Sequence, residues 1–269
     1  MMSVLEYALD INKNVNLKAD DIVMFYKDGT RFIAVLTDYK GNPIANATVY
    51  FSINGVTYVR TTDVNGSASI GLNLGSGVYG ASVYYNGSDM YDKVSKNITV
   101  TINPTVLADD LVKMYKNATK FSAKFTDSTG KALVNSDVRF NINGVFYTRT
   151  TDANGVASLA INLRPGDYII TTIFDGLDIG NKVTVLPTLV TKDLNMKYMD
   201  GSNFTAQTLD SQGKALANQT VSFNVNGVFY HRITNEDGIA SLRIRLISGE
   251  YIITSYWNNF QTGNTIKIA

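Results

Sequence analysis

Residues 51–58, FSINGVTY, decide how this chain is organised, because the same octapeptide pattern returns twice. It reappears as FNINGVFY at 140–147 and as FNVNGVFY at 223–230, at spacings of 89 and 83 residues. Each copy places Asn-Gly between two runs of alternating apolar and polar residues, which strongly predicts a β-hairpin with a type I′ turn. The chain is therefore an array of like modules, and its function is to be sought in what such an array can do.

Agreement between the copies extends well beyond the octapeptide and sets the predicted boundaries. TTDVNG at 61–66 returns as TTDANG at 150–155 and, in looser form, as ITNEDG at 233–238. From these matches we predict a tail and three repeats, over residues 1–15, 16–105, 106–188 and 189–269. The shorter second spacing means that the first repeat has six extra residues near 86–96, which we expect to form a loop.

Strand-like alternation without any helical period fills the second repeat, which we take as the template. Seven strands are predicted, centred on residues 111–115, 121–125, 138–142, 145–149, 159–163, 168–174 and 181–186. Short strands with turns every 8 to 12 residues are typical of immunoglobulin-like sandwiches. The predicted fold class is all-β, with three tandem immunoglobulin-like antiparallel β-sandwiches in an elongated array.

Two further features support this fold prediction. Tyr79, Tyr168 and Tyr251 each follow a Gly-X pair at the start of the sixth strand, which predicts the tyrosine corner of such sandwiches. Pro104 and Pro187 lie where one repeat passes into the next and favour stiff joints. Strands of about ten residues then imply a rod on the order of 110 Å.

Composition excludes several classes of function. The 269 residues contain 24 Lys and Arg against 23 Asp and Glu, with the charges balanced in every repeat, so no footprint for nucleic acid or anionic membranes is indicated. Cysteine is absent, which excludes disulfides and thiolate metal sites. No apolar run approaches membrane-spanning length, so we expect no direct membrane insertion and, for an exported protein, further domains of a longer parent chain.

No set of residues predicts catalysis or a cofactor. His231 is the only histidine, and its equivalents in the other repeats are Val59 and Thr148, so it is interpreted as a strand residue on the surface. The acidic turns at 63–65 and 152–154 could offer oxygens to calcium, but side chains in such D-x-N-G turns commonly cap their own backbone. We expect no enzyme, no cofactor and no metal site, with the calcium alternative left open.

An acid and a base recur at equivalent places in all three repeats, which favours a shared cross-strand pair. The candidate pairs are Asp21 with Arg60, Asp110 with Arg149, and Asp193 with Arg232. A lysine-to-asparagine isopeptide bond is a less favoured alternative, with Lys113 and Asn181 or Lys197 and Asn264 as its candidates. Met24 stands where Lys113 does, so that pattern is not shared by the repeats.

Aromatic residues beside amides mark the hairpin between the sixth and seventh strands as a candidate contact surface. The candidate contact residues are Trp257, Tyr256, Phe174 and Tyr85, and the alternative is that they close the end of each core. N-x-[ST] sequons permit glycosylation of an exported chain. They lie at Asn46, Asn65, Asn86, Asn97, Asn117, Asn203 and Asn218.

The motifs NINGVFY, TRTTDANGVASL, GKALANQTV and GEYIITSYW together resemble the repeat modules of adhesin-like surface proteins of methanogenic archaea, which are related to bacterial invasin-type repeats. The resemblance covers residues 16–269. It implies an extracellular stalk, attached to the cell envelope, that contacts a protein or glycan on another cell or a host surface. The alternative hypothesis is a carbohydrate-binding appendage of a larger secreted enzyme, in which tyrosines and Trp257 stack on sugar rings.

Overall fold

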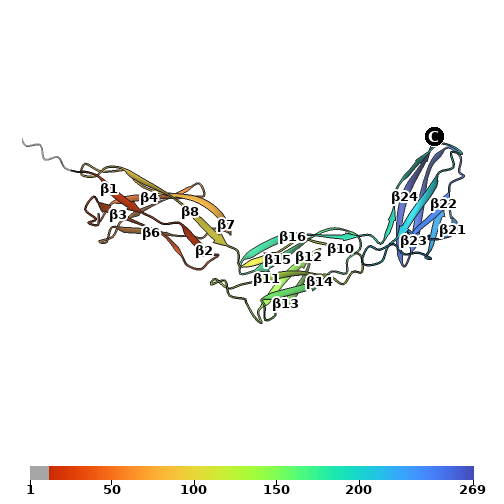
Figure 1. Cartoon of the computed structure of the whole chain (residues 1–269), viewed down its shortest axis with the longest axis horizontal. Helices are drawn as coiled ribbons and strands as arrows, with labels where there is room; N and C mark the ends of the chain where they lie inside the picture. Colours follow the sequence, from red (N-terminus) through yellow and green to blue (C-terminus); the bar gives the residue numbers. More distant parts are fainter. Residues whose placement is uncertain (1–11) are drawn as a thin grey trace, which may run out of the picture. The chain divides into compact units, whose positions relative to one another are not determined.

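The computed structural model describes residues 12–269, which form strands β1 to β24 and contain no helix (Figure 1). Of the predicted tail over 1–15, residues 1–11 lie outside the described part of the chain, and the first strand begins at Val15. Every strand belongs to one of six sheets, of which three contain three strands and three contain five strands. Each repeat supplies one sheet of each size, so the three tandem sandwiches predicted from the sequence are confirmed.

The first sandwich, coloured red to yellow in Figure 1, contains strands β1 to β8. Its small sheet has the order β1-β3-β6, and its large sheet has the order β2-β8-β7-β4-β5. The strands are β1 Val15–Lys18, β2 Ile22–Phe25, β3 Arg31–Asp38, β4 Thr48–Ile53, β5 Val56–Thr61, β6 Ser67–Gly71, β7 Gly77–Tyr85 and β8 Val94–Asn103.

The second sandwich contains strands β9 to β16 in the same arrangement. Its small sheet has the order β14-β11-β9, and its large sheet has the order β10-β16-β15-β12-β13. The strands are β9 Val106–Ala108, β10 Leu111–Met114, β11 Lys120–Phe125, β12 Asp137–Ile142, β13 Val145–Thr150, β14 Val156–Ala160, β15 Gly166–Phe174 and β16 Leu177–Leu186.

The third sandwich, teal to blue in Figure 1, contains strands β17 to β24. Its small sheet has the order β17-β19-β22, and its large sheet has the order β18-β24-β23-β20-β21. The strands are β17 Leu189–Thr191, β18 Leu194–Met196, β19 Asn203–Thr208, β20 Thr220–Val225, β21 Val228–Ile233, β22 Ile239–Arg243, β23 Gly249–Trp257 and β24 Phe260–Ile268.

The first strand of every repeat differs from the prediction, because it is divided between the two sheets. In the second sandwich β9 joins the small sheet, and β10 joins the large sheet beside β16. The register Leu111↔Val183 is parallel, so the prediction of wholly antiparallel sheets is wrong for this one pair in each sandwich. A strand that crosses between sheets keeps its direction, so it meets the last strand of the repeat in parallel.

The Asn-Gly hairpins are confirmed in all three sandwiches. Both turn residues have positive φ in each copy, as a type I′ turn requires, with 50° and 76° for Asn54 and Gly55 in the first sandwich. The predicted insertion is confirmed as a loop, because β7 ends at Tyr85 and β8 begins only at Val94, whereas β15 and β16 are separated by Asp175 and Gly176 alone.

The cores repeat as faithfully as the turns. Phe32 and Phe51 meet edge to face with ring centroids 4.9 Å apart, and the equivalent pairs in the second and third sandwiches stand 5.7 Å apart. All six rings are buried, and such pairs contribute about 0.5–1.5 kcal/mol beyond the area that they bury. Each sandwich therefore has its own apolar centre, built around one phenylalanine from each sheet.

By its internal contacts the chain divides into two compact units. The first contains the described residues up to 107 together with Lys124–Val134 and Ala153–Gly155, and the second contains the rest. The repeat boundaries given by the sequence stay a prediction. Within residues 12–269 there is no helix with the length and apolar character of a membrane span.

Candidate functional site

The three tyrosines predicted to form corners make the same hydrogen bond in every sandwich. The hydroxyl groups of Tyr79, Tyr168 and Tyr251 donate to main-chain carbonyls four residues upstream, at 2.9, 2.8 and 2.9 Å. The acceptors belong to Gly75, Arg164 and Ile247. Each tyrosine therefore ties the start of a strand of the large sheet to the segment before it, and its role is structural.

The predicted acid and base pairs are wrong. Asp110 precedes β10 and Arg149 lies on β13, and these strands are the two opposite edges of the same large sheet. Asp21 with Arg60, and Asp193 with Arg232, occupy the corresponding opposite edges in the first and third sandwiches. Sequence reasoning recognised the repetition but placed the two groups on neighbouring strands.

Each aspartate instead fixes the point where the first strand changes sheets. Asp21, Asp110 and Asp193 accept hydrogen bonds from the main-chain nitrogens of Thr99, Lys182 and Thr265, at 2.7, 2.8 and 3.0 Å. The hydrogen bond from the side chain of Asn264, followed by that from Thr265, holds the pKa of Asp193 below its ordinary value. The repeated acid therefore joins the strand crossover to the last strand of the sandwich.

Each arginine protects an edge strand. The guanidinium groups of Arg60, Arg149 and Arg232 donate to the carbonyl oxygens of the residues before them, at 2.7, 2.7 and 2.8 Å. Among the described strands, β5, β13 and β21 pair on one side only, so their other edge has main-chain groups without a strand partner. A charged side chain bonded to such an edge disfavours pairing with another chain.

The structure does not bring the isopeptide candidates together. Lys113 is opposite Val185 in the parallel register, so Asn181 lies four residues, or about 13 Å, before that position on β16. Lys113 is 5% exposed, and its ammonium group donates to the carbonyl oxygens of Ile161 at 2.8 Å and Thr119 at 3.1 Å. Lys197 is exposed beyond the end of β18, and the Asn264 side chain donates to Asp193 at 2.9 Å.

The acidic turns use their oxygens to hold main chain, which explains them without a metal. Asp63 accepts from the nitrogens of Asn65 and Ser67, both at 2.9 Å. In the third repeat Asn235 makes the same two hydrogen bonds, so a neutral amide replaces the carboxylate without loss of the turn. Among residues 12–269 no group of three or more His, Asp or Glu side chains could hold a metal ion.

His231 is exposed on β21 and is 2.7 Å from the Ser222 hydroxyl.

The aromatic contact candidates divide into two groups. Tyr85 is 6% exposed and belongs to the core of the first sandwich, so the prediction of a contact role is wrong for it. Trp257, Tyr256 and Phe174 are half-buried. Trp257 packs against the third core, and its indole nitrogen is 3.4 Å from the Gln219 side-chain oxygen. One part of the Trp257 ring therefore closes the end of the core, as the alternative interpretation expects, and the other part is open to a partner.

The candidate glycosylation sites lie on the surface with one exception. Asn117 is half-buried, and the other six asparagines are exposed. Asn46 and Asn218 have φ of 57° and 58° at equivalent turns, as expected for asparagine in the left-handed region. Carbohydrate attached to these two turns would extend into solvent.

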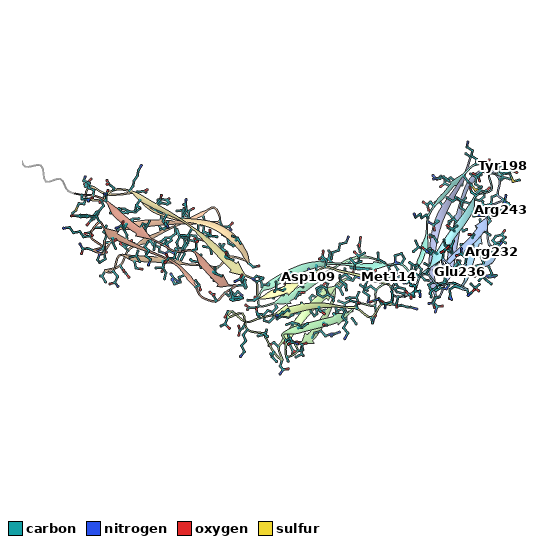
Figure 2. All side chains as sticks on the ribbon, in the orientation of Figure 1. Asp109, Met114, Tyr198, Arg232, Glu236 and Arg243 are labelled. Carbon is teal, nitrogen blue, oxygen red and sulfur yellow. The ribbon has the colours of Figure 1, made fainter. Side chains whose placement is uncertain are left out.

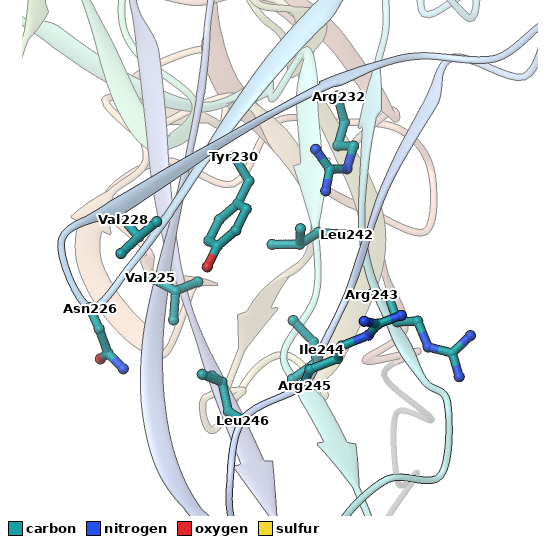
Figure 3. Close-up of a pocket in the computed structure, with 10 residues that line it drawn as sticks. All are labelled: Val225, Asn226, Val228, Tyr230, Arg232, Leu242, Arg243, Ile244, Arg245 and Leu246. Atoms are coloured by element: carbon teal, nitrogen blue, oxygen red, sulfur yellow. The ribbon is translucent and has the colours of Figure 1, made fainter.

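A groove in the third sandwich is a concave feature that sequence reasoning missed (Figure 3). It has a volume of about 490 Å³ and lies between β21 and the segment formed by β22 and the residues after it. Its apolar lining includes the buried side chains of Val225, Leu242 and Ile244. Figure 2 places Arg232 and Arg243 on this sandwich, and Arg245 completes a set of three arginines around the groove.

Two of these arginines depart from the repeat. The equivalents of Arg243 are Gly71 and Ala160, and the equivalents of Arg245 are Asn73 and Asn162. Within the described residues no carboxylate forms an ion pair with Arg232, Arg243 or Arg245. The two extra arginines in the third repeat are thus the signal in the sequence that could have identified the site. The net charge of that repeat stays close to zero, so it does not reveal them.

Comparison with known proteins finds an adhesin that is similar to this chain over most of its length. No family model matches the chain. The inverse autotransporter adhesin YeeJ of Escherichia coli (strain K12) is 23% identical over 266 residues, which covers 85% of this chain and 11% of that protein. The chain thus spans about a tenth of the length of this curated relative.

Solved structures that align with the chain include other tandem arrays. The I9–I11 tandem of titin is 13% identical, covers 95% of this chain and 99% of its own, and has a TM-score of 0.34. Invasin, a bacterial integrin-binding protein, is 17% identical, covers 95% of this chain and 60% of its own, and has a TM-score of 0.29. The fold assignment itself rests on the sheet topology described above.

Proposed function

We propose that this chain is a non-enzymatic stalk segment of a cell-surface adhesin, in which three immunoglobulin-like sandwiches hold a contact surface away from the cell envelope. The observation that carries the proposal is the threefold repetition of one sandwich, down to its phenylalanine pair and its tyrosine corner. Similarity to an inverse autotransporter adhesin over most of the chain supports it. The chain's own resemblance to adhesin-like repeats further suggests a methanogenic archaeon as its source.

A mechanical role explains which residues are the same in all three repeats. The repeated residues are those that shape turns, anchor the strand crossover and block edge strands, and none of them forms a set of acid, base and nucleophile. The arginines shield the outer edge of each large sheet, which disfavours pairing of neighbouring modules through that edge. The proposed localisation is extracellular and attached to the envelope, with carbohydrate on the exposed sequons.

The test is adhesion by the isolated chain. Beads coated with the chain are expected to be retained on a panel of whole cells and host surfaces, and beads coated with a heat-unfolded sample are not. Equal retention of the two bead types on every surface would contradict an adhesive role. Intact mass of the exported protein tests the carbohydrate, since an unshifted mass would show that the sequons are unused.

The second candidate function is a carbohydrate-binding appendage, which the open part of the Trp257 ring favours. A groove of about 600 Å³ borders Trp257, Asn258 and Gln261, so an aromatic face stands beside amide groups. A glycan array with a hit that Trp257→Ala abolishes and Trp257→Phe retains would favour this candidate. A hit that survives Trp257→Ala would exclude this residue as the sugar platform.

A further inference from the structure

The groove of the third sandwich exists because its two sheets differ in width. The small sheet ends at β22, whereas the large sheet continues to β21. In the register Val225↔Val228 and Phe223↔Tyr230, the β21 residues share the inward face of the buried β20 residues. Val228 and Tyr230 are nevertheless 51% and 36% exposed, because no strand of the small sheet covers them. The apolar inner face of the large sheet is therefore left open by the width of one strand.

The neighbouring edge of the small sheet can accept a strand. Thr208 nitrogen donates to Gly238 oxygen at 2.8 Å, and Ile244 nitrogen donates to Ser202 oxygen at 3.3 Å, so the even-numbered residues of this segment turn their main chain toward β19. Main-chain groups alternate in direction along a strand. Ser241, Arg243 and Arg245 therefore turn theirs toward the groove, and among the described strands β22 pairs with β19 alone.

The third feature is positive charge without a counterpart. Arg243 and Arg245 are exposed and two residues apart, so both extend from the same face of the segment (Figure 3). The Arg243 side chain lies against Gly201. The residue before it, Asp200, does not pair with Arg243, because its carboxylate accepts hydrogen bonds from the main-chain nitrogens of Lys197 and Ser202, both at 2.8 Å. The Arg243 guanidinium lies over Gly201, on the β19 side of β22, so it has to turn toward the free edge to meet a carboxylate of a ligand bound there, and no described acid competes with that ligand for either arginine.

We propose that this groove binds an extended acidic peptide segment of a partner protein, which adds as a fourth strand to the small sheet along β22. Alternate side chains of the peptide cover Val228 and Tyr230, and its carboxylates on the other face meet Arg243 and Arg245. A strand that joins a free sheet edge gains main-chain hydrogen bonds over its whole length, while the side-chain positions give selectivity. The inference names a partner class for the adhesive role and rests on that proposed function.

A peptide fits these observations better than an anionic glycan does. The main-chain groups of Ser241 and Arg243 that face away from β19 follow the repeat of a strand, which a sugar chain lacks. The floor is formed mainly by aliphatic side chains, Leu242 and Ile244 among them, with Tyr230 as the one aromatic ring beside them. The edge and the floor together select an extended chain with alternating acidic and apolar residues.

Fluorescence anisotropy with the full chain tests the proposal, using a labelled eight-residue peptide of alternating glutamate and valine. One peptide is expected to bind per chain. The double variant Arg243→Ala with Arg245→Asn takes the residues found at the equivalent places of the second repeat, Ala160 and Asn162, so it is compatible with the fold. It is expected to weaken binding by about tenfold or more, as the loss of two charge-assisted contacts implies.

The matched gain-of-function variant places the arginines in the second repeat. Ala160→Arg with Asn162→Arg is expected to raise the stoichiometry to two peptides per chain, because Tyr147 and Val145 stand where Tyr230 and Val228 do. Two further peptides have N-methyl groups on alternate residues, one on the glutamates and one on the valines. Both keep every charge, but each loses the hydrogen bonds that its methylated nitrogens would donate. The peptide whose methylated nitrogens face β22 is expected to bind about tenfold more weakly than the parent peptide.

Four outcomes would overturn the proposal. These are no binding of the parent peptide up to about 1 mM, equal binding by the Arg243 and Arg245 double variant, equal binding by both N-methylated peptides, and arginine-dependent binding of polygalacturonate in place of the peptide. None of them alters the fold or the retention of coated beads, so failure of this inference is distinguishable from failure of the adhesive stalk.

Discussion

Replacing Lys113 with methionine is predicted to stabilise the second sandwich. The Lys113 amine is buried and has no acidic partner among residues 12–269, and its two acceptors are neutral carbonyl groups. The equivalent side chains in the other sandwiches, Met24 and Met196, are equally buried in the same position of the core. Exchanging a buried charged group for an apolar one of similar volume is neutral or stabilises a protein by about 1–4 kcal/mol. Allowing for the two lost hydrogen bonds, we expect about 1–2 kcal/mol.

Hydrogen exchange of the full chain measures this change in one sandwich at a time. Core amides of β12 and β15 are expected to exchange about 5 to 30 times more slowly in Lys113→Met, while those of the first and third sandwiches stay unchanged as internal controls. Lys120→Met, at an exposed position on β11, is the matched control and should leave exchange in the second core nearly unaltered.

The effect should depend on pH in a defined direction. Burial lowers the pKa of Lys113 from its ordinary value of 10.5, so the unfolded chain holds this proton more tightly than the folded chain. The stability of the unmodified protein therefore rises with pH up to that ordinary value, and the advantage of methionine shrinks. Faster exchange in Lys113→Met, or an advantage that grows with pH, would refute the reasoning.

Three further predictions concern the repeated framework. Tyr168→Phe removes the hydrogen bond to Arg164 and is expected to lower the free energy of unfolding of the second sandwich by about 1 kcal/mol, measured by the same exchange experiment. Gly238→Ala would place a Cβ atom 2.6 Å from the Thr208 carbonyl oxygen at a φ of 71°, so we expect loss of at least 2 kcal/mol and an early thermal transition in calorimetry. Hydrogen bonds, led by that from Thr129, hold the pKa of Asp127 below its ordinary 3.8, so its contribution is complete above that pH and is lost as the pH falls further, which an acid titration followed by circular dichroism would detect.

Much of the fold could be predicted because its determinants are local. The Asn-Gly hairpins follow from two residues that tolerate positive φ, and the tyrosine corner follows from one side chain and a carbonyl four residues away. Phe121 and Phe140 alternate with polar residues in the sequence, so the face that they bury could be read directly. Local rules of this kind need no knowledge of which strands are neighbours.

The errors arise where the outcome depends on strand order. The crossover between β9 and β10 leaves no mark on the alternating pattern, so Asp110 was predicted to meet Arg149 although the two lie at opposite sheet edges. The groove was missed for the same reason, because it is produced by the absence of a strand beside β22. Its arginines are visible in the sequence, but their meaning depends on the open edge next to them.

Small-angle X-ray scattering of the full chain tests the central claim, that the three sandwiches form an extended stalk, most directly. Three modules in line, on the order of 110 Å in total, predict a radius of gyration of about 32 Å. A compact globule of the same length would give about 18 Å. A value near the larger figure is the result expected of a stalk, and a value near the smaller one would contradict it.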